Sequence, residues 1–254
     1  MYPKLFGFIK SFGLALAMSF IVGIYLSIRR GRKRGIEADA ILDICFAVMV
    51  SSLVGVRLFY VLTHWDQYDP WYRIFFIWDG GLTLYGGILL AIVAVWWTAH
   101  RRGIPFLFMA DILAPAVSLG IGITRIGCFL AGCCFGRPTD LPWGVIFPTT
   151  CRAGTEFGTH AIHPSQLYSS AAGFLVFGLL LWFEKLSAPM GATFGRFLLF
   201  SGIVRFLLEF TRYIEPDQMV AFGLSNNQWF SLGLIVVGTV LLVTLHRRGK
   251  AAND

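Results

Sequence analysis

The chain has 254 residues and a formal net charge of +7, and 56% of its residues are hydrophobic while only 14% are charged. Its mean hydropathy is +0.69. Soluble globular domains carry about 25% charged residues, so this composition excludes an ordinary soluble domain and predicts a protein integral to a bilayer. Much of the basic excess flanks apolar segments, which favours membrane topology and anionic membrane lipids over a nucleic-acid partner.

Seven apolar segments are long enough to cross a membrane, which takes about 20 mainly apolar residues per helix. The predicted spans are Phe12–Ile28, Ala40–Thr63, Leu82–Ala99, Leu107–Thr124, Gln166–Phe183, Phe194–Tyr213 and Trp229–His246. Because no repeat or linker divides them, we expect an all-α integral membrane protein with a single polytopic domain over residues 1–254.

Basic clusters predict the direction of the helices, because positively charged loops stay on the cytoplasmic side. They follow the first, third, fifth and seventh spans, at Arg29–Arg34, Arg101–Arg102, Lys185 and Arg247–Lys250. We therefore expect the amino terminus outside, the carboxyl terminus in the cytoplasm, and the long connection 125–163 on the outer face. The first span lacks a clear small-residue cleavage site and is expected to be retained.

Two glycine pairs open the third span within Asp79–Gly87. Glycine permits unusual backbone angles and close approach of a neighbour. Gly86 and Gly87 therefore predict either a helix-packing contact or a cradle for a ligand.

Arginine, glycine and thiols lie together at the mouth of a membrane helix in Arg125–Pro138, which indicates a site rather than packing against lipid. The rest of the connection, Pro138–Ile162, is too irregular in pattern to predict a folded soluble domain and is expected to form a cap over the membrane surface.

Four of the five cysteines fall in this connection, at positions 128, 133, 134 and 151. On an oxidising face we expect structural thiols or a disulfide that pairs Cys151 with one of the other three. Metal binding is the alternative, but the pattern Cys128-x4-Cys133-Cys134 departs from the usual spacing of zinc ligands, and His160 or His163 would have to complete the site. We expect no metal and no cofactor.

Polar residues at two further helix ends are candidates for a site. His163 precedes Pro164 and Gln166 at the start of the fifth span, where proline is typical of a first helical turn, and it is either a base or an interfacial histidine. Arg205 and Glu209 lie four residues apart on one face of the sixth span, with Arg212 just beyond. They form either an internal salt bridge or an arginine pocket for an anion such as phosphate. Arg57 lies deeper and either joins this pocket or extends to the interface.

Four motifs follow one another along residues 78–217. They are Gly80-Gly81-x-x-x-Tyr85-Gly86-Gly87, Arg125-Ile126-Gly127-x-Phe129-x-x-Gly132-x-x-x-Gly136-Arg137, His163-Pro164-Ser165-Gln166-Leu167-Tyr168 and Arg205-Phe206-x-x-Glu209-Phe210-x-Arg212. In order and spacing they resemble the bacterial prolipoprotein diacylglyceryl transferase family, which implies seven spans with the amino terminus outside.

The resemblance implies transfer of the diacylglyceryl group from phosphatidylglycerol to the lipobox cysteine in the signal peptide of a prolipoprotein, with release of glycerol 1-phosphate. It implies a bacterial cytoplasmic membrane protein whose site faces the periplasm. Arg125 and Arg205 would polarise the phosphate, Glu209 would orient Arg205, and Gly136 would hold the loop near the substrate. The other implied substrate-binding residues are Gly86, Gly87, Cys128, Gln166 and Arg212.

The chain departs from the family pattern at the candidate base and in the loop. Tyr85 stands where the family usually has histidine, and Cys128 and Cys133 stand where it usually has asparagine and glutamate. Because a phenol has an ordinary pKa of about 10, it is a poor base at neutral pH. His163 or hydroxide would then deprotonate the acceptor thiol, unless a loop cysteine acts as a nucleophile in a covalent relay.

Two alternative functions remain open on the sequence alone. A related enzyme would keep the arginine pocket and transfer a lipid moiety to a different acceptor. A non-catalytic protein would bind or transport phospholipid, although polar residues through the depth of several spans would then be expected. The polar residues gather near one membrane face, which favours a one-sided pocket.

Overall fold

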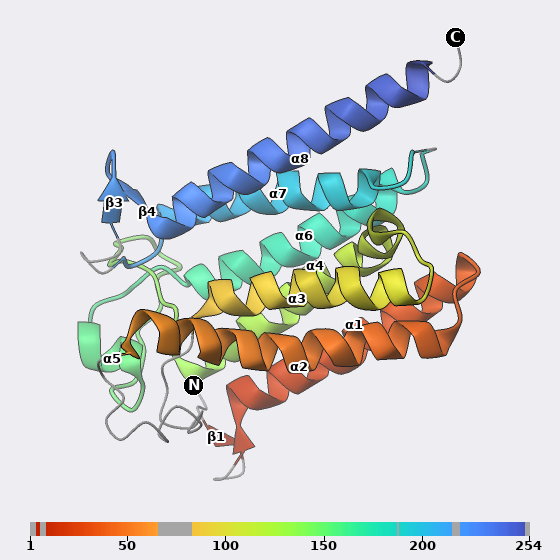
Figure 1. The fold of residues 1–254 in the computed structure, drawn as a ribbon. Helices are drawn as coiled ribbons and strands as arrows, with labels where there is room; N and C mark the ends of the chain where they lie inside the picture. Colours follow the sequence, from red (N-terminus) through yellow and green to blue (C-terminus); the bar gives the residue numbers. More distant parts are fainter. Residues whose placement is uncertain (1–3, 6–8, 66–82, 187, 215–218, 252–254) are drawn as a thin grey trace. The chain divides into compact units, whose positions relative to one another are not determined.

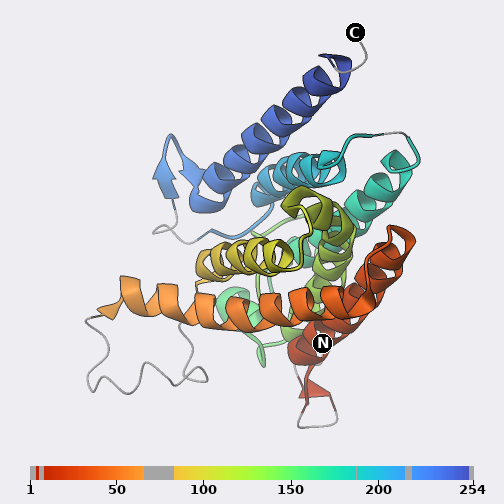
Figure 2. The same cartoon turned by 45° about the vertical axis from the view of Figure 1, so that its right-hand side comes forward.

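The computed structural model describes residues 4–5, 9–65, 83–186, 188–214 and 219–251, which are mainly helical (Figure 1, Figure 2). Its helices are α1 (Ser11–Lys33), α2 (Ala38–Thr63), α3 (Leu84–Arg101), α4 (Phe106–Ala131), α5 (Arg152–Phe157), α6 (Ser165–Phe183), α7 (Ala192–Glu209) and α8 (Asn226–Ala251). Two short antiparallel hairpins pair β1 (Lys4–Leu5) with β2 (Ile9–Lys10), and β3 (Met219–Ala221) with β4 (Leu224–Ser225). The predicted all-α membrane class is confirmed.

Six of these helices, namely α1, α2, α3, α4, α6 and α8, are long and apolar enough to cross a membrane. The sequence predicts seven such segments. The seventh, Phe194–Tyr213, overlaps α7, which differs from the six because it carries Arg196, Arg205 and Glu209 within 18 residues. These charges make α7 too polar to be recognised as a span by composition. The direction of the helices across the membrane stays a prediction.

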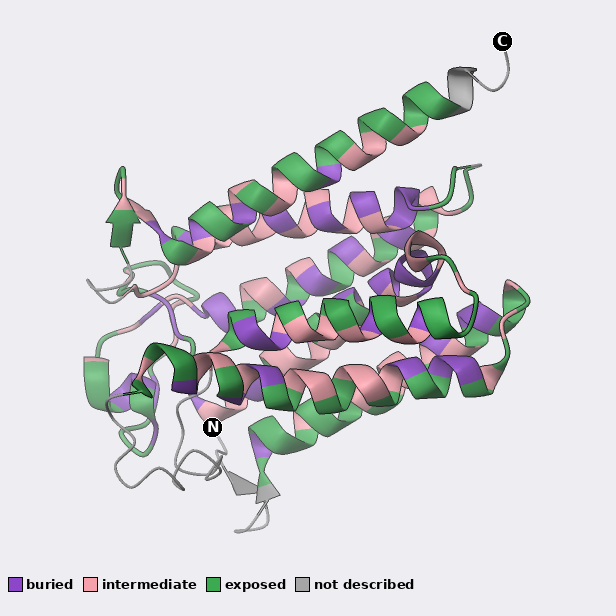
Figure 3. Cartoon of the chain, viewed as in Figure 1, coloured by how far each residue is buried: buried purple, intermediate pink, exposed green. Residues whose placement is uncertain are grey.

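Much of α8 is exposed (Figure 3), and many of its exposed residues are large and apolar. Val236, Val237 and Val240 are each more than half exposed. Contiguous apolar surface of this kind is unfavourable in water and is covered when lipid surrounds the helix. The surface chemistry therefore agrees with the membrane assignment made from helix length.

The chain forms two compact units, residues 27–110 and residues 1–26 with 111–254. In the first unit, glycines allow α2 and α3 to approach closely. A Cβ on Gly86 would lie 2.5 Å from Cβ of Phe59, and a Cβ on Gly87 would lie 2.6 Å from Cγ1 of Val56. Both glycines therefore serve helix packing, as small residues commonly do between membrane helices.

In the second unit, α4 and α6 also meet at small residues. A Cβ on Gly173 would lie 2.8 Å from the backbone nitrogen of Gly122. The Ser118 hydroxyl donates to the carbonyl of Gly173 at 2.9 Å, and the Ser170 hydroxyl donates to that of Gly122 at 2.7 Å. Close approach and hydrogen bonds across the interface fix the register of the two helices that lead into and out of the connection 125–163.

A buried carboxylate fixes the start of α7. Asp111 on α4 accepts hydrogen bonds from the backbone nitrogens of Gly191 at 2.6 Å and Phe194 at 2.7 Å. The first backbone N–H groups of a helix have no partner within the helix, so a carboxylate placed there satisfies them and interacts favourably with the helix dipole. Asp111 thereby links α4 to α7, the two helices that carry the candidate arginines.

We expect Asp111→Ala to destabilise the protein by about 1.5–3 kcal/mol, the contribution typical of a hydrogen bond to a charged group, because two buried N–H groups lose their acceptor. Thermal unfolding of the purified protein in detergent measures the effect. Asp43→Ala is the matched control, since Asp43 pairs with Arg102 at an exposed position and should contribute about 1 kcal/mol or less. Equal decreases in unfolding temperature for the two variants would contradict the proposed role of Asp111 at the start of α7.

Candidate functional site

A buried carboxylate at the end of α7 organises the candidate site. Glu209, the last residue of α7, is 1% exposed. Its Oε2 lies 3.0 Å from Nη2 of Arg205 and 3.4 Å from Nη1 of Arg212. Its Oε1 accepts hydrogen bonds from the Ser225 hydroxyl at 3.0 Å and from Nδ2 of Asn227 at 2.8 Å. Four donors therefore hold one carboxylate, and that carboxylate fixes two guanidinium groups.

Positive charge exceeds negative charge around Glu209. Arg125, six residues before the end of α4, is close enough to interact electrostatically with Arg205, as Arg212 also does. Three guanidinium groups and one carboxylate leave a formal excess of two positive charges. Because arginine presents a planar fork of donors that matches phosphate oxygens, this excess suits an anionic phosphate ligand.

The arginine cluster borders an open depression of about 400 Å³, lined by Arg137, Arg212, Tyr213, Ile214 and Met219. The Nε atom of Arg212 is buried and, within the described part of the chain, has no hydrogen-bond partner. An unpaired buried donor is costly. A ligand with oxygen acceptors would satisfy it, which makes Arg212 a candidate contact for an anion entering from this depression.

The signature loop begins with a tight turn at the end of α4. Gly132 has φ +67°, a left-handed conformation that glycine adopts without strain. Its N–H donates to the carbonyl of Phe129 at 3.2 Å, and the N–H of Cys133 donates to that of Cys128 at 3.1 Å. This pair of hydrogen bonds is the Schellman motif, which ends a helix and turns the chain back on itself.

The start of α6 holds the signature loop in place. Gln166 Nε2 donates to the carbonyl of Cys133 at 2.8 Å, and the Ser165 hydroxyl donates to that of Cys134 at 3.2 Å. Both donors are 1% exposed. The predicted substrate-binding residue Gln166 therefore supports the backbone of the loop. Its Oε1 is buried with no hydrogen-bond partner among the described residues.

The loop thiols interact with one another and with the arginines. Hydrogen bonding from the thiols of Cys128 and Cys133 lowers the pKa of the Cys134 thiol below its ordinary value, and the positive charges of Arg125 and Arg212 lower it further. Because a thiolate is the reactive and metal-binding form of cysteine, Cys134 is the thiol best suited to act as an anion.

Gly136 joins the signature loop to the segment that follows α7. Gly136 forms a β-bridge with Arg212, the Arg137 N–H donates to the carbonyl of Thr211 at 3.1 Å, and the Tyr213 N–H donates to that of Phe135 at 3.2 Å. A Cβ on Gly136 would lie 2.7 Å from that Thr211 oxygen. Only glycine fits between these backbones, which explains how the loop reaches the arginine cluster.

His163 lies on the other side of Gly136. A Cβ on Gly136 would lie 2.6 Å from Cβ of His163, and the His163 N–H donates to the carbonyl of Arg137 at 3.0 Å. Its Nδ1 lies 3.4 Å from the Tyr168 hydroxyl, which accepts a hydrogen bond from Trp143 Nε1 at 2.7 Å. The side chain is thus oriented by a tyrosine beside the arginine-bearing segment.

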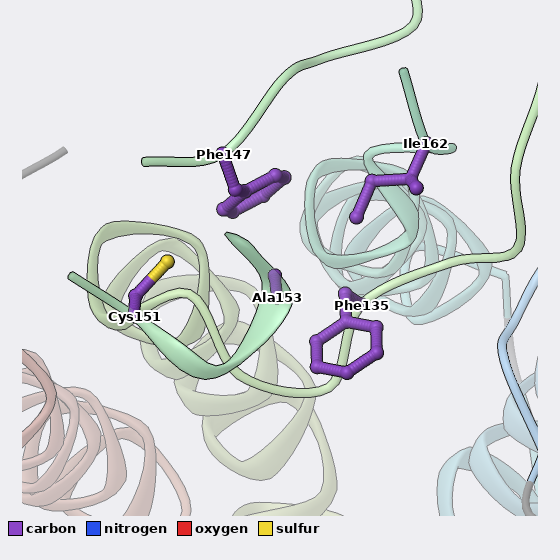
Figure 4. Packing of buried hydrophobic residues seen from close by; sticks show 5 residues of the cluster. All are labelled: Phe135, Phe147, Cys151, Ala153 and Ile162. Atoms are coloured by element: carbon purple, nitrogen blue, oxygen red, sulfur yellow. The ribbon is translucent and has the colours of Figure 1, made fainter. Parts of the chain in front are cut away.

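The connection between α4 and α6 has a small core of its own (Figure 4). Phe135, Phe147, Cys151, Ala153 and Ile162 are all buried together, and the short helix α5 supplies Ala153. The sequence predicts a cap too irregular for a folded soluble domain, and the structure adds that this segment has a small buried cluster. Two isolated bridges pair Ile162 with residues 138 and 145 and close the cap.

Cys151 is a free thiol, as are the other four cysteines. Its sulfur donates a hydrogen bond to the carbonyl of Pro148 at 3.2 Å. The structure therefore does not contain the predicted disulfide between Cys151 and a loop cysteine.

Most of the predicted site residues come together within one unit of the structure. They are Arg125, Cys128, Gly136, His163, Gln166, Arg205, Glu209 and Arg212. Tyr85, Gly86 and Gly87 belong to the other unit, together with Arg57. Tyr85 is partly exposed in the first turn of α3, while Gly86 and Gly87 pack on α2. Their roles in binding or catalysis stay predictions, and residues 79–82 of the same motif lie outside the described residues.

Sequence reasoning missed two residues of this site, Ser225 and Asn227, which bind Glu209. Arg137, which lies in the predicted signature stretch, lines the depression. The polar run Ser225-Asn226-Asn227-Gln228 before an apolar helix was the sequence signal for Ser225 and Asn227, because polar side chains at a helix end commonly form hydrogen bonds.

Known proteins are similar to this chain over nearly its whole length. The profile of the family described as prolipoprotein diacylglyceryl transferase matches residues 4–244. The phosphatidylglycerol–prolipoprotein diacylglyceryl transferase of Cupriavidus metallidurans is 38% identical over 96% of this chain and 92% of its own length. Those of Vibrio campbellii and Bordetella avium are each 37% identical, over 95% and 93% of this chain and 88% and 89% of their own.

We expect Gly136→Ala to displace the loop and destabilise the protein by about 1–3 kcal/mol, because the added methyl group meets two backbones. Limited proteolysis within residues 138–162 and thermal unfolding measure the effect. Gly178→Ala is the matched control, since a Cβ there has no neighbour within 4 Å and alanine favours the helix. Unchanged protease resistance in Gly136→Ala would show that the loop does not depend on this contact.

Proposed function

We propose, because this chain belongs to the prolipoprotein diacylglyceryl transferase family, that it transfers the diacylglyceryl group of phosphatidylglycerol to the thiol of a prolipoprotein cysteine. The observation that carries the proposal is the cluster of Arg125, Arg205 and Arg212 around the single carboxylate of Glu209. A phospholipid phosphate carries the complementary charge.

The proposed reaction makes one bond and breaks one. The acceptor sulfur attacks the glyceryl carbon that carries the phosphate ester, a carbon–sulfur bond forms, and the carbon–oxygen bond to phosphate breaks. The bonding electrons leave with glycerol 1-phosphate. Arginines that gather around the phosphate stabilise the charge that develops on it in the transition state. Glu209 acts as a positioning residue, because it fixes Arg205 and Arg212 without meeting the reacting atoms.

Loss of the thiol proton requires a base, and His163 is the candidate beside the arginine-bearing segment. Tyr85 supplies a hydroxyl in the other unit, and hydroxide from solvent is the remaining candidate. Direct attack by the acceptor is favoured over a relay through a loop cysteine. A relay would need two successive substitutions at the same glyceryl carbon: a loop sulfur would first displace the phosphate oxygen, and the acceptor sulfur would then displace the loop sulfur.

The acceptor in this proposal is the lipobox cysteine of a prolipoprotein signal peptide, and both substrates reach the site from the membrane. The protein is multi-pass, with six helices suited to crossing the bilayer. We place it in the bacterial cytoplasmic membrane with the arginine cluster toward the periplasm. The positions of the basic clusters support this orientation.

Reconstituted protein with labelled phosphatidylglycerol and a lipobox peptide should yield the diacylglyceryl thioether. We expect Arg125→Ala and Arg205→Ala each to lower kcat by about 10²–10³-fold, the typical loss when one donor to a developing anion is removed. Arg196→Ala is the matched control on α7, because Arg196 contacts the carbonyl of Phe183 and the ring of that residue. A folded wild-type protein that gives no thioether, while a relative of the family does, would indicate a different acceptor or lipid binding without transfer.

If His163 takes the proton from the acceptor thiol, His163→Gln should lower kcat by about 10²–10⁴-fold at neutral pH. The loss should shrink as pH rises, because hydroxide then replaces the missing base. Tyr168→Phe is the comparison that removes only the hydroxyl next to Nδ1. A loss that is the same at every pH would assign His163 to binding or loop structure.

A further inference from the structure

Three cysteine side chains of the signature loop converge on one point. The sulfur atoms of Cys128, Cys133 and Cys134 all lie within 4.8 Å of one another. Cys128 is buried, Cys133 is partly buried and Cys134 reaches the surface. A disulfide uses two sulfurs and leaves the third unexplained, whereas a single ion between them would use all three.

The turn at Gly132 explains why this convergence is hidden in the sequence. In a Schellman motif the N–H of the residue after the glycine donates to the carbonyl five positions before that residue, and here these two residues are Cys133 and Cys128. Cys134 then has φ +56°, a left-handed conformation unusual for a residue with a side chain. The helix end therefore brings Cys133 and the adjacent Cys134 back beside Cys128, which an extended loop would not do.

Hydrogen bonds from α6 fix the backbone around the thiols without a ligand. Gln166 and Ser165 donate to the carbonyls of Cys133 and Cys134, and both donors are buried. Ligands whose supporting groups are already fixed lose little freedom when they bind a metal, and such outer contacts typically strengthen binding.

The charge around the thiols favours an anionic centre. Arg125 acts electrostatically on Cys128 and Cys134, and Arg212 acts on Cys134. Three thiolates around a divalent ion carry a net charge of about −1. The surrounding guanidinium groups offset that charge. Without them, a negative charge at the end of a membrane helix would be unfavourable.

We propose that Cys128, Cys133 and Cys134 together bind one thiophilic metal ion, of the class of Zn²⁺ or Cu⁺. Thiolate ligands select such soft ions over Mg²⁺ or Ca²⁺. Each sulfur–metal bond forms as a thiol releases its proton to solvent, so binding releases protons and changes no oxidation state. Water or another donor completes the coordination. The site is distinct in chemistry from the transferase reaction and does not require it.

Titration of the reduced, purified chain with Cd²⁺ tests the proposal, since cadmium–thiolate absorbance reports the ligands directly. We expect the absorbance to saturate at one equivalent and Zn²⁺ to compete. The variant with serine at all three positions should lose the signal. Cys45→Ser is the matched control, because Cys45 lies on α2 and outside the cluster, and its titration should be unchanged.

Each single variant, C128S, C133S or C134S, should weaken binding by about tenfold or more, as loss of even an outer-shell partner does. These variants carry the test if the triple variant fails to fold. Titration curves that persist in all of them would overturn the proposal. So would protein recovered from membranes without reductant in which two of the three sulfurs are joined in a disulfide.

Discussion

The buried carboxylate of Glu209 is the interaction on which the site depends. An unpaired charge at this depth would be strongly unfavourable, and removal of one partner from a buried ion pair costs more than the pair contributes in net terms. Arg205, Arg212, Ser225 and Asn227 together satisfy both oxygens. The end of α7, the segment that follows it and the start of α8 are therefore fixed by one side chain, and the guanidinium groups keep their orientation without a ligand.

A second constraint is steric and brings the signature loop to these arginines. Gly132 ends α4 in a left-handed turn, and Gly136 lets the loop backbone lie against the Arg212 segment. Both positions exclude larger side chains, because Cys151 occupies the space beside Gly132 and backbone atoms occupy the space beside Gly136. The buried hydrogen bonds from Ser165 and Gln166 then hold the loop between α4 and α6. The arginines attract an anionic ligand, and the two glycines determine how close the signature loop lies to the Arg212 segment.

The sequence predicts most of the helices, because a membrane span needs a long apolar run that is visible in the sequence. It also predicts the Arg205–Glu209 pair, because residues four apart lie on one face of a helix. Partners supplied after a change of chain direction are not predictable in this way. Ser225 and Asn227 reach Glu209 only after the β3–β4 hairpin, and the core around Phe147 and Ile162 forms without a regular pattern. The apolar residues of α7 predict a seventh span, although Arg196, Arg205 and Glu209 make this helix more polar than the six others.

The convergence of the three thiols is another contact that the sequence pattern does not predict. Zinc ligands in short loops are typically two to four residues apart, so Cys128-x4-Cys133 lies at the upper end of that range and the adjacent Cys133 and Cys134 fall outside it. The Schellman turn reverses the chain at the end of α4 and so brings Cys133 back beside Cys128. The number of residues between two cysteines does not reveal such a reversal. The same turn also directs the loop toward Gly136 and the arginines. Since this reversal places the thiols close enough to Arg125 and Arg212 to interact electrostatically, any charge gained by the sulfurs alters the field that a phosphate meets there. Chemistry at the thiols and anion binding at the arginines are therefore electrostatically coupled, even though different side chains perform them.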